Sequence, residues 1–271
     1  MDGRFEGKVA LITGSTQGIG EAVAKRMATE GAAGIVITGR NAGRGEAVRA
    51  AIEETGTAAI FVQAELGSID DLSNLIARAD ERFGRIDVLV SAAALSYRGS
   101  IVDTTPELFD TLMAVNVRAP LFLIQGAVEI MRREDTGGTI VTVGSVAAHG
   151  SAPFLLPYAM TKGALVPMTK NLAYSLMWDR IRVNLLQPGW MDTPGEDVIQ
   201  RAAHGAEDGW LEAAEAAQPF GRLIKPHELA AAIAFLASDE SGVMTGAVID
   251  YDQSVPSAGI HGKPLPEETP R

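Results

Sequence analysis

The sequence contains no cysteine, no long basic run and no apolar signal core in its first residues. The lack of cysteine excludes disulfides and thiolate metal sites, and it permits a reducing compartment. A formal net charge of -11 makes nucleic acid and anionic membrane surfaces poor partners. We find no stretch that should span a bilayer, and therefore expect a cytoplasmic protein with no membrane and no nucleic acid among its partners.

The four histidines are scattered along the chain without the spacing of metal ligands. They are His149, His204, His227 and His261. Together with the missing cysteines, this distribution predicts no catalytic metal.

Short runs rich in Val and Ile alternate with segments of helix length, and 46% of the residues are apolar. This alternation predicts an α/β fold in one domain, a doubly wound (Rossmann-like) parallel sheet with helices on both faces. We expect the domain to cover residues 1–255 and the proline-containing tail, 256–271, to be irregular. The expected strands, about seven in number, cover about residues 8–13, 34–38, 59–63, 86–91, 138–144, 181–187 and 247–251.

A glycine-rich turn follows the first expected strand, in Thr13-Gly14-Ser15-Thr16-Gln17-Gly18-Ile19-Gly20. A helical segment begins at once and stops near Gly31. Glycines between a strand and a helix let backbone N–H groups approach a pyrophosphate, whose charge the helix N-terminus favours. A bare glycine cluster would more often be an ordinary tight turn, but this context favours a nucleotide site.

Tyr158 and Lys162 are four residues apart, with Ser145 thirteen residues before Tyr158. On a helix the pair shares one face, so the ammonium can lower the pKa of the phenol. A phenol tuned in this way can exchange a proton with an alcohol or a ketone. In isolation, such a pair is also compatible with a tyrosine resting on a solvated lysine stem.

Together, the glycine turn and the Ser145/Tyr158/Lys162 set resemble the short-chain dehydrogenase/reductase family, over nearly the whole chain. Two segments depart from the family pattern: Ser91-Ala92-Ala93-Ala94 lacks two amides that brace the sheet, and Gln253-Ser254 replaces two glycines. Further stretches occur in the expected order: Asp87-Val88-Leu89-Val90, Asn116, Ile181–Gly189, Thr193 and Thr245–Asp250.

The resemblance implies a catalytic set of Asn116, Ser145, Tyr158 and Lys162. Tyr158 would be the general acid/base and Ser145 would hold the substrate oxygen. Lys162 would perturb Tyr158 and bind the nicotinamide ribose, and Asn116 would steady a water next to Lys162. Asn116 could instead satisfy local backbone, and Ser145 could belong only to a turn at a strand end.

The resemblance also implies which residues contact the cofactor. Thr193 could alternatively be the N-cap of a following helix. The implied set is Gly14, Ser15, Thr16, Gln17, Gly18, Ile19, Gly20, Gly39, Arg40, Asn41, Glu65, Leu66, Ala92, Ala93, Ala94, Tyr158, Lys162, Pro188, Gly189 and Thr193.

The end of the second strand favours NADP(H) over NAD(H). Gly39 occupies the position of the acidic residue that accepts hydrogen bonds from a free ribose, and Arg40 can grip a phosphate. Arg40 could also be a solvated loop residue. Gln17, where a basic residue often supports NADP(H), is neutral, and Glu65 resembles the aspartate that contacts adenine.

Residues 190–220 are expected to form a mobile cover over the substrate, which the resemblance places near Ser145, His149, Tyr158 and Trp190. The helix-like part of this cover is 212–218. Trp190 could stack on a sugar ring or close a core. Four polar residues of the cover could indicate a hydroxyl-rich substrate, although a solvated helix face is the more ordinary explanation: Arg201, His204, Glu207 and Asp208.

The sequence therefore predicts an enzyme, an oxidoreductase that interconverts an alcohol and a carbonyl, with a sugar, polyol or small hydroxy compound as substrate. The alternatives are a dinucleotide-binding regulator or scaffold without catalysis, and an isomerase or dehydratase that retains its cofactor. The resemblance also implies a homotetramer, or a dimer, assembled through the apolar stretches 121–124 and 165–168.

Overall fold

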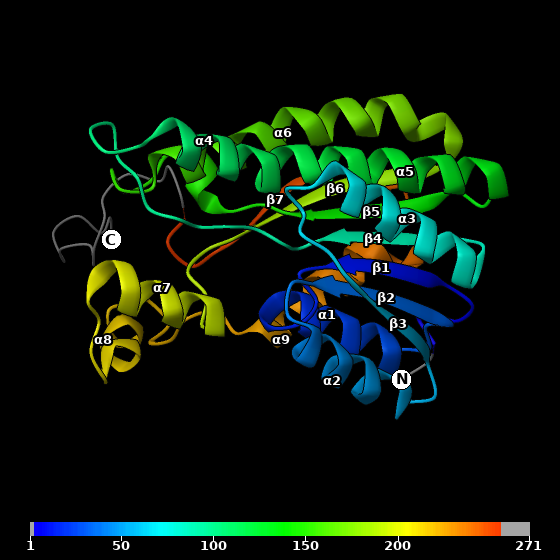
Figure 1. The fold of residues 1–271 in the computed structure, drawn as a ribbon, viewed down its shortest axis with the longest axis horizontal. Helices are drawn as coiled ribbons and strands as arrows, with labels where there is room; N and C mark the ends of the chain where they lie inside the picture. The colour runs from blue at the N-terminus through cyan, green and yellow to red at the C-terminus, as the bar shows by residue number, and fades with distance from the viewer. Residues whose placement is uncertain (1–2, 256–271) are drawn as a thin grey trace, which may run out of the picture.

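The computed structural model describes residues 3–255, so the predicted irregular tail, 256–271, lies outside the described residues. Its centre is one parallel sheet of seven strands in the order β3-β2-β1-β4-β5-β6-β7 (Figure 1), which confirms the predicted fold class. The strands are β1 (Val9–Thr13), β2 (Gly34–Gly39), β3 (Ala58–Gln63), β4 (Val88–Ser91), β5 (Gly138–Val143), β6 (Ile181–Pro188) and β7 (Val248–Tyr251).

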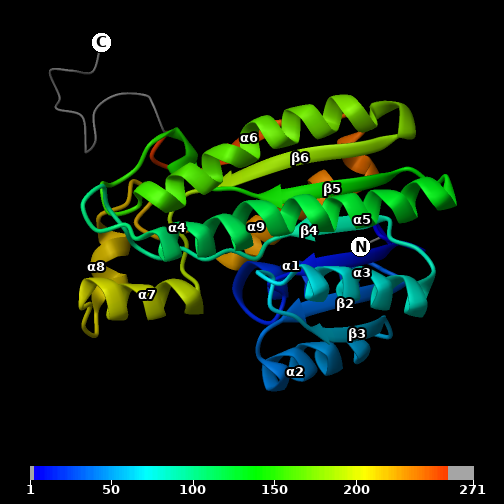
Figure 2. The same cartoon turned by 45° about the horizontal axis from the view of Figure 1, so that its top comes forward.

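Helices cover both faces of the sheet, with α3 to α6 on one face and α1, α2 and α9 on the other (Figures 1 and 2). Helices α7 and α8 lie beyond the carboxyl ends of the strands. The helices are α1 (Gly18–Thr29), α2 (Ala42–Glu53), α3 (Ile69–Phe83), α4 (Pro106–Met113), α5 (Ala119–Glu134), α6 (Leu156–Leu176), α7 (Pro194–His204), α8 (Trp210–Ala216) and α9 (Pro226–Ala237).

The central strands are apolar on both sides because each side meets a helical layer. All five residues of β1 are buried. Successive side chains of a strand point to opposite faces, so Ile12 packs into the core beneath α1 and α9 while Leu11 packs into the core beneath α3 and α5. This double burial explains why the strands appear in the sequence as continuous apolar runs.

The strand order reverses at β1, which pairs with β2 on one side and with β4 on the other. The chain leaves β1 toward one edge of the sheet and later returns to build the other half. In open parallel sheets, ligands bind beyond the carboxyl ends of the strands at such a reversal. The fold therefore directs attention to the loops after β1 and β4.

Residues 106–134 correct one expectation from the sequence. Helix α4, a π-helical turn at Ala114–Arg118 and α5 run on as one helix of 29 residues. By length and composition alone this helix could cross a membrane, which the sequence reading missed. Half of its most apolar window is buried, however, and Leu123 and Ala127 pack into the core beneath the sheet.

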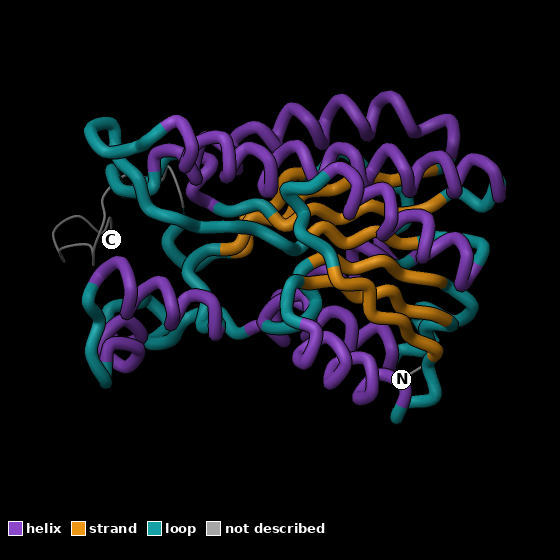
Figure 3. The backbone as a smooth tube through the Cα atoms, in the orientation of Figure 1, coloured by secondary structure: helices purple, strands orange, loops and turns teal. Residues whose placement is uncertain are grey.

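The segment 190–220 contains two helices that stand apart from the sheet layers (Figure 3). The predicted helical stretch, 212–218, is α8, shifted by two residues toward the N-terminus. Helix α7 precedes it and begins at the N-cap Thr193, whose side chain accepts a hydrogen bond from the Glu196 N–H.

Candidate active site

The turn after β1 requires glycine for two physical reasons. Gly14 and Gly18 have φ angles of +64° and +60°, where a side chain causes strain. A Cβ on Gly14 would lie 2.9 Å from the Ala93 Cα, and one on Gly20 would lie 2.5 Å from the Gly14 carbonyl oxygen. The turn, the start of α1 and the loop after β4 are therefore packed backbone against backbone.

Helix α1 begins at this turn without a side-chain cap, because the side chain of the N-cap Gln17 accepts no hydrogen bond from the helix. Elsewhere, Asn41, Ser68, Thr105 and Thr193 cap α2, α3, α4 and α7 through their side chains. The first N–H groups of a helix have no partners within the helix and attract anions. The glycine turn thus exposes backbone donors that fit a phosphate.

The segment Ser91-Ala92-Ala93-Ala94 is braced without the amides of the family pattern. The Thr13 hydroxyl accepts hydrogen bonds from the N–H groups of Ala92 and Ala93, both at 3.1 Å. Ala94 has no positive φ, so its methyl group introduces no strain. Thr13, the last residue of β1, takes over the bracing.

The end of β2 combines a small residue with an exposed cation. A Cβ on Gly39 would lie 2.7 Å from the Thr16 hydroxyl, so Thr16 fills the space of an acidic side chain. Arg40 is 62% exposed, and its guanidinium lies 3.9 Å from the Glu65 carboxylate across the ends of β2 and β3. Asn41 caps α2, and Leu66 is buried.

Asn116 lies at the π-helical turn, and its amide binds the backbone of Leu95. Its Oδ1 accepts from the Leu95 N–H and its Nδ2 donates to the Leu95 carbonyl, both at 2.8 Å. The Nδ2 also donates to the Thr161 hydroxyl at 3.1 Å. The alternative interpretation, a bond to local backbone, is therefore wrong, because Asn116 binds backbone in the distant loop after β4.

Ser145, Tyr158 and Lys162 come together at the carboxyl end of β5. Ser145 follows this strand, and its hydroxyl accepts from the Ala147 N–H at 3.2 Å, so it also serves the turn. Lys162 is 3% exposed, and its Nζ donates to the Val143 carbonyl at 2.8 Å. The same Nζ lies 5.7 Å from the centre of the Tyr158 ring.

Burial dominates the ionisation of this pair. It raises the pKa of the half-buried Tyr158 phenol, while interaction with the Ser145 side chain lowers it. Burial also lowers the pKa of Lys162 to about 8, because the charged ammonium has lost its water. The direction at Tyr158 is opposite to the one expected from the spacing, since desolvation outweighs the favourable interactions.

The segment after β6 meets both the C-terminal strand and the glycine turn. Gly189, after Pro188, has no room for a Cβ beside Asp252, and its N–H donates to the Tyr251 carbonyl at 3.0 Å. A Cβ on Gly18 would lie 3.8 Å from the Thr193 side chain. Thr193 therefore caps α7 and also lies at the predicted phosphate turn.

His149 and Trp190 make side-chain bonds of their own. His149 Nε2 lies 2.9 Å from the Asp250 carboxylate and 3.0 Å from the Gln187 amide, at the ends of β6 and β7. Trp190 donates from Nε1 to the Glu196 carboxylate at 2.9 Å and stacks on Trp210. Trp190 is 39% exposed, so it does not close a core.

Two charged residues near the site were missed by the sequence reading: Arg98, in the loop after β4, and Glu196, on α7. The Arg98 Nη2 lies 3.6 Å from the Glu196 Oε1, and the side chains are only 16% and 17% exposed. The Glu196 charge raises the pKa of Tyr158 and the Arg98 charge lowers it. No motif signals a pair so far apart in sequence.

The polar residues of α7 and its following loop divide into two groups. Arg201 binds the exposed carboxylates of Asp197 and Asp208, as a solvated helix face does. His204 instead accepts a hydrogen bond from Arg98 Nε at 3.0 Å and packs edge-on against Phe154. No group of three or more His, Asp or Glu side chains within residues 3–255 could hold a metal ion.

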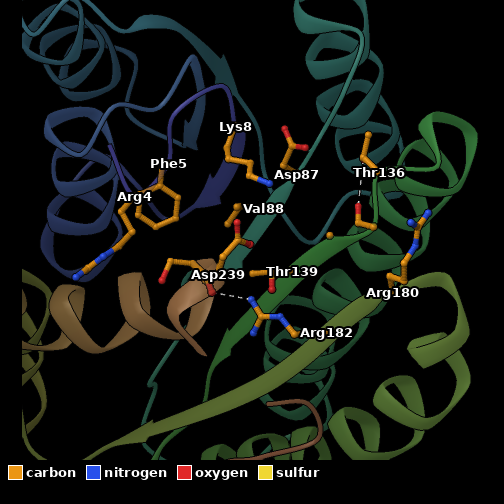
Figure 4. A pocket seen from close by; sticks show the side chains of 14 residues that line it. Arg4, Phe5, Lys8, Asp87, Val88, Thr136, Thr139, Arg180, Arg182 and Asp239 are labelled. Atoms are coloured by element: carbon orange, nitrogen blue, oxygen red, sulfur yellow. Dashed lines mark hydrogen bonds between the residues drawn. The ribbon is translucent and has the colours of Figure 1, made fainter. Parts of the chain in front are cut away.

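The amino ends of the strands form the opposite edge of the sheet, where a cavity of about 110 Å³ is lined by Lys8, Thr139 and Arg182 among others (Figure 4). There Arg182 donates to the carbonyls of Leu236 and Ser238 at 3.0 and 2.9 Å. Asp87 accepts from the Val9 N–H and from Arg85.

Comparison with known proteins places this architecture among oxidoreductases. A family model described as enoyl-(acyl carrier protein) reductase matches residues 14–254. Dehydrogenase/reductase SDR family member 4 from Bos taurus is 35% identical over 246 residues, which is 90% of this chain and 86% of that protein.

Two solved structures share the fold over most of both chains. L-sorbose reductase from Gluconobacter frateurii, complexed with NADPH and L-sorbose, superposes with a TM-score of 0.86 at 30% identity and covers 93% of this chain and 98% of its own. A 3-oxoacyl (acyl-carrier-protein) reductase from Agrobacterium tumefaciens C58 with NADP bound has a TM-score of 0.82 at 30% identity, over 92% of this chain and 94% of its own.

Proposed function

This chain belongs to the short-chain dehydrogenase/reductase family, and from that membership we propose that it interconverts an alcohol and a carbonyl compound by hydride transfer. The observation that carries the proposal is the convergence of Ser145, Tyr158 and Lys162 at the carboxyl end of β5, next to the reversal of strand order. A protein that only binds a dinucleotide has no use for a proton donor there.

The chain's own residues fit a nicotinamide dinucleotide. The uncapped N-terminus of α1 and the close-packed Gly14–Gly20 turn supply backbone donors for its pyrophosphate. When bound, this cofactor donates or accepts the hydride. The exposed Arg40 and the lack of an acidic side chain at Gly39 favour NADP(H) over NAD(H), and the two solved relatives, which hold NADPH and NADP, agree with this preference.

In the reduction direction, Tyr158 donates its proton to the carbonyl oxygen as the carbonyl carbon receives the hydride, so a ketone, a hydride and a proton give an alcohol. Its raised pKa keeps the phenol protonated at neutral pH, which suits this direction. Ser145 holds the same oxygen. The Lys162 ammonium, 5.7 Å from the centre of the Tyr158 ring, stabilises the phenolate that remains after the proton has been given to the substrate.

Asn116 acts as a positioning residue in this scheme. Through Leu95 and Thr161 it ties the loop after β4 to the helix that carries Tyr158 and Lys162. Asn116 thereby fixes the distance between the wall of the site and the proton donor.

We propose a sugar, a polyol or a small hydroxy compound as substrate, covered by residues 190–220 as a lid. Trp190 is half-exposed and donates a hydrogen bond to Glu196. Its ring offers a flat apolar surface for a sugar ring. The solved relative that holds L-sorbose supports the same class.

The experiment is to follow nicotinamide absorbance with purified protein, NADPH or NADH, and a panel of hydroxyketones, sugars, keto acids and apolar ketones. Oxidation of NADPH by one neutral hydroxyketone group supports the proposal. If no compound is reduced while NADPH binding is confirmed in the same samples, the proposed activity is wrong.

We further propose a homotetramer or dimer in the cytoplasm. Leu121 and Phe122 on α5 are exposed apolar residues and offer a surface for a second copy. The other apolar residues of the expected stretches contribute less, because Leu123, Ile124 and Leu165 are buried in the core. Sedimentation at micromolar concentration tests the assembly, and a monomer would contradict it.

A further inference from the structure

Arg98 is held beside the helix that carries the proton donor. Its neighbour Gly99 donates from its N–H to the Phe154 carbonyl at 2.9 Å and forms a parallel bridge with Leu155. Leu155 immediately precedes α6, and Tyr158 lies in the first turn of that helix. The loop after β4 therefore places Arg98 next to the start of α6.

The guanidinium of Arg98 is positioned by three contacts. Its Nε donates to His204 at 3.0 Å, its Nη1 donates to the Ser96 carbonyl at 2.8 Å, and its plane lies over the Phe154 ring at 5.7 Å. The side chain is 16% exposed, so the charge is mostly removed from water. Its Nη2 makes no hydrogen bond to any residue between 3 and 255.

Glu196 faces Arg98 from the first turn of α7. Its Oε1 accepts from Trp190 Nε1 at 2.9 Å and from Gln200 Nε2 at 2.7 Å. The Arg98 Nη2 is 3.6 Å from this oxygen, beyond hydrogen-bond distance. The second oxygen, Oε2, accepts no hydrogen bond within the described part of the chain.

With respect to residues 3–255, the pair therefore presents one free donor and one free acceptor of opposite charge. The Gly99–Leu155 bridge and the contact of Arg98 with the Phe154 ring place the pair beside the segment that leads into Tyr158. A hydroxyl group can accept from Arg98 Nη2 and donate to Glu196 Oε2 at the same time. Hydrogen bonds to charged groups are stronger than neutral ones, so this site can distinguish substrates.

We propose that Arg98 and Glu196 together select the substrate, by binding a hydroxyl group of a neutral hydroxyketone or polyol close to the reacting carbon. This inference rests on the proposed function and names the residues that determine its substrate class. It also assigns the lid a role in recognition, because Glu196 belongs to α7 and Arg98 to the body of the protein.

The same geometry disfavours two other substrate classes. A substrate carboxylate next to the carbonyl would be attracted by the Arg98 guanidinium and repelled by the Glu196 carboxylate. These two interactions oppose each other, so the pair gives such a substrate little net binding energy. An apolar ketone would cover the pair and leave both polar atoms without partners and without water, which is costly. A site built to bond a hydroxyl rejects an analogue that lacks one.

The test compares three compounds of similar size: hydroxyacetone, butanone, in which a methyl group replaces the hydroxyl, and pyruvate. The wild-type protein should reduce hydroxyacetone with the highest kcat/KM. In Arg98→Met the ratio of kcat/KM for hydroxyacetone over butanone should fall at least about tenfold, because a charged hydrogen bond is lost. The double variant Arg98→Met/Glu196→Gln, which leaves no unpaired charge, should show the same fall.

Arg201→Met is the matched control, since Arg201 lies on α7, the helix that carries Glu196, and pairs with the exposed carboxylates of Asp197 and Asp208. It should leave the ratio within about twofold of wild type. If Arg98→Met lowers kcat/KM equally for hydroxyacetone and butanone, the pair merely holds α7 in place and does not select the substrate. A higher kcat/KM of the wild-type protein for pyruvate than for hydroxyacetone would overturn the inference outright.

Binding measured by saturation-transfer NMR separates this inference from the proposed function. If hydroxyacetone binds more strongly than butanone, and Arg98→Met removes the difference, the pair reads the hydroxyl even if no hydride is transferred. If hydride transfer occurs but neither binding nor kcat/KM depends on the hydroxyl, the function stands and the inference falls. Absence of hydroxyacetone binding together with absence of turnover overturns both.

Discussion

The two edges of the sheet treat their charged groups differently. At the amino ends, Arg182 and Asp87 are bonded to backbone groups and to neighbouring side chains (Figure 4). At the carboxyl ends, α1 has no side-chain cap, Lys162 is buried with a lowered pKa, and Arg98 and Glu196 approach only to 3.6 Å. The first edge stabilises the fold, whereas the second holds the groups that we propose bind cofactor and substrate.

Among the variants considered, Tyr158→Phe should have the largest effect on the groups at the carboxyl ends of the strands. General acid/base catalysis contributes about 100-fold to 10,000-fold in rate, so turnover should fall by about that factor. NADPH affinity and thermal stability should persist, because within residues 3–255 the phenol interacts with the Ser145 side chain and bonds no other helix or strand. The measurements are NADPH oxidation, fluorescence titration with NADPH and thermal unfolding.

The control for this variant is Tyr174→Phe, on the same helix, where the side chain is 76% exposed. It should keep full activity. Unchanged turnover in Tyr158→Phe would contradict the assigned mechanism.

Arg182→Met should have the opposite effect. It removes the charged hydrogen bonds to the carbonyls of Leu236 and Ser238, although both carbonyls still accept from the Ser241 hydroxyl. Hydrogen bonds to charged groups contribute about 1.5–3 kcal/mol, so we expect the free energy of unfolding to fall by about 1–3 kcal/mol. Urea unfolding measures this change, and KM and kcat should stay near wild type at a temperature where the variant is folded.

Arg180→Met is the matched control for this edge, because Arg180 is exposed and pairs with the exposed Asp135. It should change stability by less than about 1 kcal/mol. If Arg182→Met loses activity but not stability, the amino ends of the strands take part in the reaction and do not serve only to stabilise the fold.

Lys162→Met should make the protein inactive yet more stable at neutral pH. Burial lowers the pKa of Lys162 from its ordinary 10.5 to about 8, so the unfolded chain binds this proton more tightly than the folded protein. The resulting destabilisation is complete below pH 8 and disappears as pH rises to about 10.5. After the loss of the bond to Val143 is subtracted, we expect a gain on the order of 1–3 kcal/mol at pH 7.

Urea unfolding of the cofactor-free protein at a series of pH values measures the effect, with Lys170→Met on the same helix as the control. The gain should shrink between pH 8 and 10.5. A lower free energy of unfolding for Lys162→Met than for wild type at pH 7 would show that Lys162 stabilises the fold and would contradict this prediction.

Arg40→Ala should have the smallest effect and should act on cofactor choice alone. Loss of one charged hydrogen bond to a phosphate weakens NADPH binding by about tenfold or more, while NADH binding should change by less than about twofold. Fluorescence titration with both cofactors measures the difference. The control is Arg49→Ala, whose guanidinium is occupied by Glu46 and Glu53. Equal weakening of both cofactors would mean that Arg40 does not read a phosphate.

The sequence predicts those parts of the molecule that depend on local backbone and on burial patterns. The strands are continuous apolar runs because both faces are covered, and the turn glycines are required by positive φ and by contact with Ala93. These constraints act on neighbouring residues and therefore leave visible patterns.

The substrate-facing side could not be predicted in this way. Arg98 and Glu196 meet only because the loop after β4 and α7 converge, and both would pass as solvated charges in the sequence. The pKa of Tyr158 rises instead of falling because burial, which spacing does not reveal, outweighs the nearby charges. Asn116 binds Leu95 in a loop 21 residues away, and only the tertiary fold brings these two residues together.

Hydride transfer is observed most directly with NADPH that carries deuterium at both positions of the hydride-bearing carbon of the nicotinamide, incubated with the protein and hydroxyacetone. We predict that NMR will find deuterium on the carbinol carbon of the product with wild-type protein, and almost none with Tyr158→Phe. If NADPH binds and the product, or the unchanged substrate, carries no deuterium at that carbon, then this protein does not transfer hydride and the account is wrong.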